Sequence, residues 1–158
     1  DHRDLHSFPT RRSSDLGRGI RVIGDYAHHP TEIRALLDAV RQAGAGRILA
    51  VFQPHRYTRT LALGGDFPPA FAGAARVLLL PVYAASEKPL AGGTSADLLD
   101  RFRADAGAPP TELCGSFEDA VKRVAELWRP GDRVLLVGAG DIESIGPVLR
   151  NLLERSEK

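Results

Sequence analysis

The sequence predicts an α/β fold: a single domain with a Rossmann-like, mostly parallel sheet flanked by helices. Short apolar runs alternate with longer segments whose apolar residues recur at helical spacing. Clusters of Gly, Pro and Asp separate these segments, as expected of turns. Polar side chains, including every histidine after residue 16, follow two of the apolar runs, and an open α/β sheet binds ligands at that edge.

The composition is that of one soluble globular domain. The chain has 158 residues, of which 43% are apolar and 26% are charged. Its net charge of +1 gives no basis for expecting a nucleic acid or an acidic membrane as a partner. A single cysteine excludes an intrachain disulfide, which suits the reducing cytoplasm, where we expect the protein to act. No apolar run approaches the roughly 20 residues that a membrane helix needs.

The first residues, DHRDLHSFPTRRSSDL, show neither helical nor strand periodicity. A disordered tail or an expression scar has this character. From Ser7 to Leu16, however, the segment resembles the translation of a short-read sequencing adapter. We therefore expect residues 1–16 to be non-native and disordered, and we base the fold and the function on residues 17–158. Because the chain contains no methionine, even at position 1, we expect it to be a fragment.

After this segment, strands and helices alternate. Residues 18–26 are expected to form a strand, and Pro30 then suits the first position of a helix, where a missing N–H costs no hydrogen bond. Apolar residues from Ile33 to Val40 continue this helix, and Gly44-Ala45-Gly46 ends it. Residues 47–52 form an unbroken apolar run, which is typical of a strand covered on both faces.

A short or broken helix is expected next, because Gly64-Gly65 and Pro68-Pro69 interrupt the segment. Residues 77–80 form the third strand. A helix over residues 95–104 follows, with Thr94 or Ser95 as its N-cap. Joined by right-handed crossovers, such alternating elements form a parallel sheet with helices on both faces.

In the last part of the chain, the sequence predicts strands at residues 112–114 and 134–137 and helices at residues 116–128 and 142–154. Ser116 is the expected N-cap of the first helix and Asp141 that of the second. Asp141 ends the segment Gly138-Ala139-Gly140-Asp141, which is similar to the start of a dinucleotide fingerprint. Because the segment lacks the third glycine and follows the last strand, a tight turn is the favoured interpretation.

The first polar loop, DYAHHPTE at residues 25–32, directly follows a predicted strand. A carboxylate such as that of Asp25 can accept two hydrogen bonds from a ribose diol, and Tyr26 offers a flat face and a hydroxyl. His28 and His29 could contact a phosphate or a metal. The alternative is a structural strand-to-helix turn in which His29 caps the helix.

The second polar loop, QPHRYTRT at residues 53–60, also follows a predicted strand. Arg56 and Arg59 lie three residues apart, so that two guanidinium groups on one turn can clamp a carboxylate or a phosphate. The embedded His55 and Tyr57 favour a functional site. The alternative is a solvated basic face.

The three histidines could also suggest zinc. Their spacing matches no common zinc pattern, and Cys114 is far away in the sequence, so we expect no metal site. The sequence contains no Walker phosphate loop and no clear context for a catalytic serine or cysteine.

With both loops in view, the chain resembles the C-terminal domain of the Mur ligases of peptidoglycan synthesis. The segment DYAHHPTE is similar to a motif of this family that folylpolyglutamate synthases share in part. FQPHRYTRT, at residues 52–60, is similar to the most distinctive signature of the Mur ligases that use L-alanine. VYAA at residues 82–85 and GAGD at residues 138–141 match two further segments in the same order. The likeness runs from about residue 20 to residue 153.

The resemblance implies an ATP-dependent amide ligation. ATP would phosphorylate the lactyl carboxylate of UDP-N-acetylmuramate, and the amine of L-alanine would attack the acyl phosphate. N-terminal and central domains, absent from this chain, would hold the UDP-sugar, the phosphate loop and the ligands of Mg²⁺. This domain would close over them, and the isolated fragment would be inactive.

The resemblance also implies a role for individual residues. Asp25 would bind the ATP ribose, Tyr26 would pack near the adenine or ribose, and His28 would approach the phosphates. The expected catalytic and substrate-binding residues are Arg56 and Arg59, which would hold the alanine carboxylate, and His55, near the incoming amine. These are positioning and electrostatic roles.

The chain departs from the family pattern at three positions. Gly24 stands where a second aspartate is common, Pro81 replaces an aspartate, and Ser86 replaces a glycine. Two alternatives remain: a Mur-type ligase for a larger amino acid or a peptide, and a stand-alone nucleotide-binding module.

Overall fold

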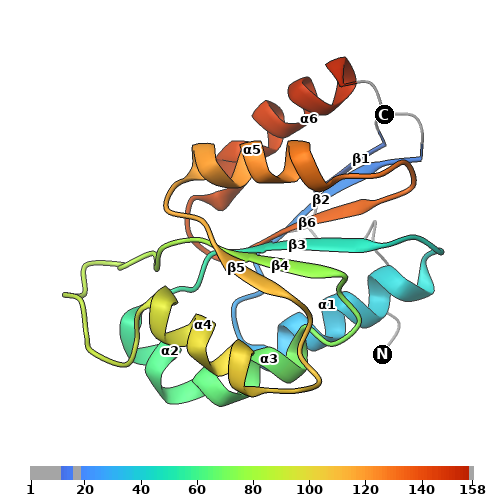
Figure 1. Cartoon of the computed structure of the whole chain (residues 1–158). Helices are drawn as coiled ribbons and strands as arrows, with labels where there is room; N and C mark the ends of the chain where they lie inside the picture. Colours follow the sequence, from blue (N-terminus) through green and yellow to red (C-terminus); the bar gives the residue numbers. More distant parts are fainter. Residues whose placement is uncertain (1–11, 16–18, 157–158) are drawn as a thin grey trace.

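The computed structural model describes residues 12–15 and 19–156. Its strands form one sheet in the order β1-β2-β6-β3-β4-β5 (Figure 1). β2 to β6 run parallel, and β1 pairs antiparallel with β2 at the edge, so the predicted α/β fold is confirmed. The strands are β1 (Arg12–Asp15), β2 (Arg21–Asp25), β3 (Ile48–Phe52), β4 (Arg76–Leu79), β5 (Thr111–Leu113) and β6 (Arg133–Val137).

Helices cover both faces of the sheet (Figure 1). On one face lie α1 (Pro30–Gln42), α2 (Tyr57–Leu63), the 3₁₀ turn η1 (Gly64–Asp66), α3 (Phe67–Ala70) and α4 (Ser95–Ala104). The other face carries α5 (Phe117–Leu127) and, after the 3₁₀ turn η2 (Ile142–Ser144), α6 (Ile145–Arg155). Within the described ranges, no helix combines the length and the apolar character needed to cross a membrane.

The alternation of side chains along the strands produces two hydrophobic cores. On the first face, Ile23 of β2 and Leu135 of β6 pack with the buried stripe of α1, which includes Leu36. On the second face, their neighbours Val22 and Leu136 pack with the apolar residues of α5 and α6. All residues of β3 and β6 are buried, as expected for strands with helices on both faces.

The broken helix after β3 is confirmed. The segment from Tyr57 to Ala70 folds as α2, η1 and α3 in succession. Gly64 and Gly65 form the 3₁₀ turn with Asp66, and the prolines at 68 and 69 lie within the first turn of α3, where they displace no helical hydrogen bond.

The expectation of disorder for residues 1–16 is wrong for residues 12–15, which form β1. Arg12 is the register partner of Gly24, and Asp15 is the partner of Arg21. An edge strand is held by backbone hydrogen bonds that any residue except proline can make, so missing apolar periodicity does not exclude it. The rest of the segment lies outside the described residues, and its non-native origin stays a prediction.

The predicted last helix is also corrected. It begins as the 3₁₀ turn η2 before α6, and the side chain of Asp141 makes no capping hydrogen bond. In contrast, Thr94 caps α4 in a reciprocal capping box with Asp97, and Ser116 caps α5, as predicted.

At the start of β6, one buried carboxylate ties the preceding turn to the beginning of β3. Asp132 is 2% exposed and accepts hydrogen bonds from Arg47 Nε at 3.0 Å, Arg47 Nη2 at 2.7 Å and the Arg129 amide at 2.7 Å. The hydrogen bonds with Asp132 raise the pKa of Arg47.

We expect Asp132→Ala to lower the free energy of unfolding by about 2 kcal/mol, because charge-assisted hydrogen bonds to a buried carboxylate are lost. Urea unfolding followed by the fluorescence of the buried Trp128 measures this change. Asp100→Ala, at an exposed position of α4, is the matched control and should change stability by less than about 0.5 kcal/mol. Equal effects of the two substitutions would contradict the role of Asp132.

Candidate functional site

Three loops leave the sheet at the same level of its carboxyl edge. Asp25 of β2 and Phe52 of β3 are both register partners of Val137 in β6. The loop after β6 leads to the α5–α6 face, whereas the loops after β2 and β3 lead to α1 and α2 on the opposite face (Figure 1). Connections that diverge in this way open the crevice in which α/β sheets bind ligands.

The first loop begins with a tight turn around Asp25. This carboxylate is 5% exposed, and its Oδ1 accepts a hydrogen bond from the Ala27 amide at 2.8 Å. Tyr26 lies at the surface with 39% of its area exposed, and its hydroxyl donates to Glu143 Oε2 at 2.9 Å. Tyr26 is therefore connected to the segment after β6.

His29 has the structural role that we considered as the alternative. Its Nδ1 accepts a hydrogen bond from the Thr31 amide at 3.3 Å, and Glu32 Oε1 accepts from the His29 amide at 3.1 Å, which forms a capping box for α1. Burial raises the pKa of Glu32, but the amides of His28 and His29 outweigh this effect, and the pKa lies below its ordinary value.

His28, in contrast, faces the second loop. Its Nδ1 lies 2.9 Å from the carbonyl oxygen of Tyr26, which can only accept, so Nδ1 carries a proton. The ring centroids of His28 and His55 are 5.7 Å apart. The two loops that the sequence singled out therefore meet through these histidines.

His55 is held by Arg59. The Nη1 group of Arg59 donates to His55 Nδ1 at 3.0 Å and to the His55 carbonyl at 3.2 Å. Because a guanidinium can only donate, Nδ1 is the acceptor and the proton of the neutral ring lies on Nε2. Burial, and then the positive charge of Arg59, lower the pKa of His55, so the ring favours this neutral form.

Arg56 stands in a strained position at the start of α2. It is exposed, and its φ of 71° lies in the left-handed region. Among the described residues, the other two non-glycine residues with such angles are Ala85 (50°) and Ser86 (73°), in the segment that packs against this turn. Backbone strain of this kind persists only where surrounding contacts impose it, and it concentrates at functional sites.

Residues 83–87, which we call the strap, supply those contacts. The Tyr83 ring stacks on His55 with centroids 5.4 Å apart and 14° between planes. The Arg56 amide donates to the Tyr83 carbonyl, and the Tyr83 amide donates to the Pro54 carbonyl, each at 2.8 Å. At the other end, Glu87 accepts hydrogen bonds from Thr58 N at 3.1 Å and Thr58 Oγ1 at 2.6 Å. The hydroxyl of Thr58 is the main cause of the lowered pKa of Glu87.

Tyr83 and Glu87 were not among the predicted site residues. The sequence signal was present, because the strap begins inside the VYAA segment, but no periodicity shows that this segment packs on residues 54–58. Sequence analysis likewise missed the contact between Gln53 and Asp141. Gln53 is 5% exposed, and its Nε2 donates to Asp141 Oδ1 at 2.8 Å.

Two cavities adjoin the site. One of about 300 Å³ is bordered by Gln53, Tyr83 and Asp141 together with Ser116 and Phe117 at the start of α5.

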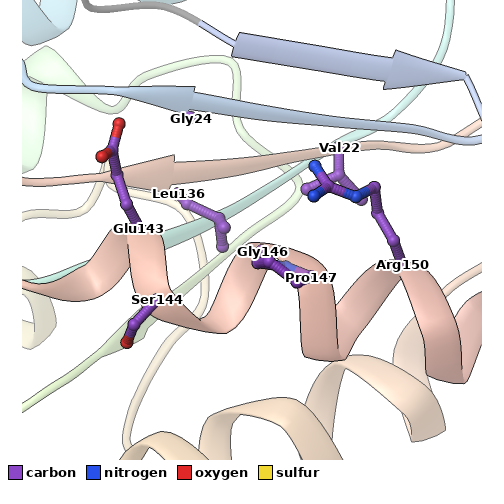
Figure 2. Close-up of a pocket in the computed structure, with 8 residues that line it drawn as sticks. All are labelled: Val22, Gly24, Leu136, Glu143, Ser144, Gly146, Pro147 and Arg150. Carbon is purple, nitrogen blue, oxygen red and sulfur yellow. The ribbon is translucent and has the colours of Figure 1, made fainter.

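The other, of about 310 Å³, lies between β2 and α6. Figure 2 shows Glu143 at its end near Gly24 and Arg150 directed toward Val22 at the opposite end. Among the described residues, no group of three or more His, Cys, Asp or Glu side chains could hold a metal ion.

A family model and a named relative show the family to which this chain is similar. The model of the domain described as "Mur ligase, glutamate ligase domain" matches residues 10–140. This range includes residues 10–16 and so gives no support there to the prediction of a non-native segment. A UDP-N-acetylmuramate–L-alanine ligase from Acidobacterium capsulatum is 45% identical over 136 residues, which are 86% of this chain and 29% of that protein.

Solved structures agree with this result. The UDP-N-acetylmuramate–alanine ligase of Thermotoga maritima matches with a TM-score of 0.64 and 28% identity, over 86% of this chain and 26% of that one. A MurF ligase of Thermotoga maritima in complex with ADP has the same fold, with a TM-score of 0.63 and 17% identity, over 96% of this chain and 33% of that one. The chain thus spans well under half the length of these proteins.

We expect the pKa of His55, measured from its NMR ring-proton shifts, to lie below 6.5 and to rise toward 6.5 in Arg59→Gln. Below about pH 6.5, the unfolded state then binds more protons than the folded state. The contribution of His55 to the free energy of unfolding therefore falls as the pH drops below 6.5. Arg34→Gln, on the exposed side of α1, is the control and should leave the pKa unchanged. A pKa of His55 at or above 6.5 would contradict the assignment.

Gly140 provides a second test. A Cβ at this position would lie 2.6 Å from both Gln53 Oε1 and Tyr83 Cγ, whereas a Cβ at Gly24 would meet nothing within 4 Å. Gly140→Ala should therefore lower stability by about 1–3 kcal/mol in urea unfolding and shift the NMR signals of His55, because Tyr83 has to move. Gly24→Ala is the control, and a similar loss in both variants would refute this packing.

Proposed function

This chain belongs to the Mur ligase family, and we propose that it is the C-terminal domain of an ATP-dependent ligase that joins L-alanine to UDP-N-acetylmuramate. The observation that carries the proposal is the meeting of the two loop motifs at His28 and His55, with Arg56 and Arg59 beside them. The 45% identity to a named alanine ligase supports the choice of substrates. The reaction would take place in the cytoplasm, whose reducing conditions suit a chain with a single cysteine.

The nucleotide would lie against the first loop. Tyr26 exposes a flat surface next to the crevice, which suits packing on an adenine or ribose. Asp25 is largely buried, so a ribose hydroxyl would reach only the small exposed part of its carboxylate. ATP itself is inferred from the family resemblance, and a related ligase of the same fold is known in complex with ADP.

His28 would approach the phosphates. Because its Nδ1 proton is directed to the Tyr26 carbonyl, the neutral ring offers only an acceptor at Nε2. The imidazolium form alone can donate a hydrogen bond to phosphate while it keeps the bond to Tyr26.

Arg56 and Arg59 would hold the carboxylate of L-alanine. Arg56 is exposed at the start of α2, and Arg59 uses one nitrogen for His55, which leaves Nε and Nη2 for a substrate. With Nδ1 occupied, His55 presents an N–H donor at Nε2 and not a free base. We propose that His55 orients the amino acid and that another group accepts the proton of its amine.

Other parts of the enzyme would come from chain segments outside this fragment. The phosphate loop, the ligands of Mg²⁺ and the pocket for the UDP-sugar are expected in central and N-terminal domains, since this chain spans 29% of its alanine-ligase relative. When bound there, Mg²⁺ would neutralise charge on the phosphates. The isolated chain should show no ligase activity.

The proposal is tested by joining residues 19–158 to the N-terminal and central domains of the Acidobacterium capsulatum ligase. The fusion should release phosphate only when ATP, UDP-N-acetylmuramate and L-alanine are all present. Arg56→Ala and Arg59→Ala should each raise the KM for L-alanine at least tenfold, because each removes a charge-assisted contact with the carboxylate. Arg34→Ala is the control and should behave like the parent fusion.

The alternatives give different outcomes in the same assay. Phosphate release with glutamate, diaminopimelate or a peptide but not with alanine would identify another Mur-type ligase. A folded fusion that binds ATP but releases no phosphate with any of the amines tested would support a nucleotide-binding module. An unchanged KM for L-alanine in both arginine variants would refute their assigned role.

A further inference from the structure

At the amino edge of the sheet, opposite the candidate site, two arginines lie side by side. Arg21 begins β2 and Arg133 begins β6, and the two are register partners in neighbouring parallel strands. Ile23 and Leu135, two residues further along, belong to the core on the α1 face, so both arginines project to that face. Like charges that face each other on adjacent strands repel.

Arg133 is unusual because it is a buried arginine, with only 7% of its area exposed. Its guanidinium donates to the carbonyls of Val40, Gly44 and Gly46, at the end of α1, where the helix dipole is negative. Its Nε is buried and has no hydrogen-bond partner. Burial, and then the charge of Arg21, lower the pKa of Arg133, as expected where no carboxylate compensates the charge.

Ion pairing distinguishes these two arginines from their neighbour Arg47. Arg47 forms a salt bridge with Asp132 at 2.7 Å. Within the described part of the chain, neither Arg21 nor Arg133 forms a salt bridge. Among the residues whose side chains the structure describes, these two positive charges therefore share one side of the sheet without an ion-pair partner.

A cavity of about 150 Å³ lies between these arginines and the end of α1. It is bordered by Arg21 and Arg133 and by small residues, namely Gly19, Ala43, Gly44, Ala45 and Gly131. At about 30 Å³ for each water molecule, it has room for several waters or for one compact ion. Small residues also allow a ligand to approach the backbone closely.

We propose that this cavity binds a small oxyanion of the phosphate type, held by Arg21 and Arg133. The anion offsets the repulsion between the two guanidinium groups and supplies the negative charge that the described side chains do not provide there. The site lies at the opposite edge of the sheet from the histidine loops. It is independent of the proposed ligase function and requires no other domain.

The test is an NMR titration of the ¹⁵N-labelled chain with inorganic phosphate, with ionic strength held constant by sodium chloride. Saturable shifts are expected at the amides of Gly19, Ala45 and Gly131 and at Arg133 Nε. Arg21→Gln should abolish these shifts. The matched control Arg34→Gln, which removes an exposed arginine of α1, should retain them.

Thermal unfolding gives an independent readout in the same variants. Without phosphate, Arg21→Gln should unfold at the same or a higher temperature than the parent, because a repulsion is removed. Phosphate should raise the Tm of the parent and of Arg34→Gln but not that of Arg21→Gln. A phosphate effect that is absent from the parent, or equal in all three proteins, would overturn the proposal.

Discussion

The pairing of β6 between β2 and β3 is the interaction on which the rest of the molecule depends. β6 is the last strand in sequence, yet its ladder joins two strands that are close to the start of the described chain. Its register brings Asp25 and Phe52 level with Val137. Long-range parallel pairing of this kind costs loop-closure entropy. The burial of β6 on both faces offsets this cost. Without this pairing, the loops that carry the histidines would not share one edge.

Within this framework, the strap fixes the second loop, which meets the first loop at His28 and His55. Stacking of Tyr83 on His55, the backbone hydrogen bond from Arg56 and the bond from Thr58 to Glu87 all act within residues 54–58. They hold Arg56 at a φ angle that an isolated peptide would avoid. Preorganised positive charge is most effective when it needs no rearrangement as the ligand arrives. The neutral state of His55 follows from its burial and then from the positive charge of the neighbouring Arg59.

The sequence was sufficient for features that depend on local chemistry. The apolar run of β3, the start of α1 at Pro30 and the cap at Thr94 are encoded within a few residues, and the structure agrees with each. Residues 12–15 were predicted wrongly because β1 is held by the backbone of β2 and carries no apolar pattern of its own. Asp141 was predicted wrongly because its partner, Gln53, is distant in the sequence. An edge strand depends on the backbone of the neighbouring strand, and a contact between side chains depends on the tertiary fold. Neither leaves a periodic signal in the sequence.

The same distinction applies to the site. Its residues were found because polar loops after apolar strands have a physical meaning in α/β sheets, and because their order matches a family. Their geometry came only from the fold, including the donor role of His55 and the use of one Arg59 nitrogen within the chain. The most direct measurement is a crystal structure of the fusion ligase with a non-hydrolysable ATP analogue and L-alanine. The account predicts the alanine carboxylate between Arg56 and Arg59. An alanine bound elsewhere, with both guanidinium groups in solvent, would contradict it.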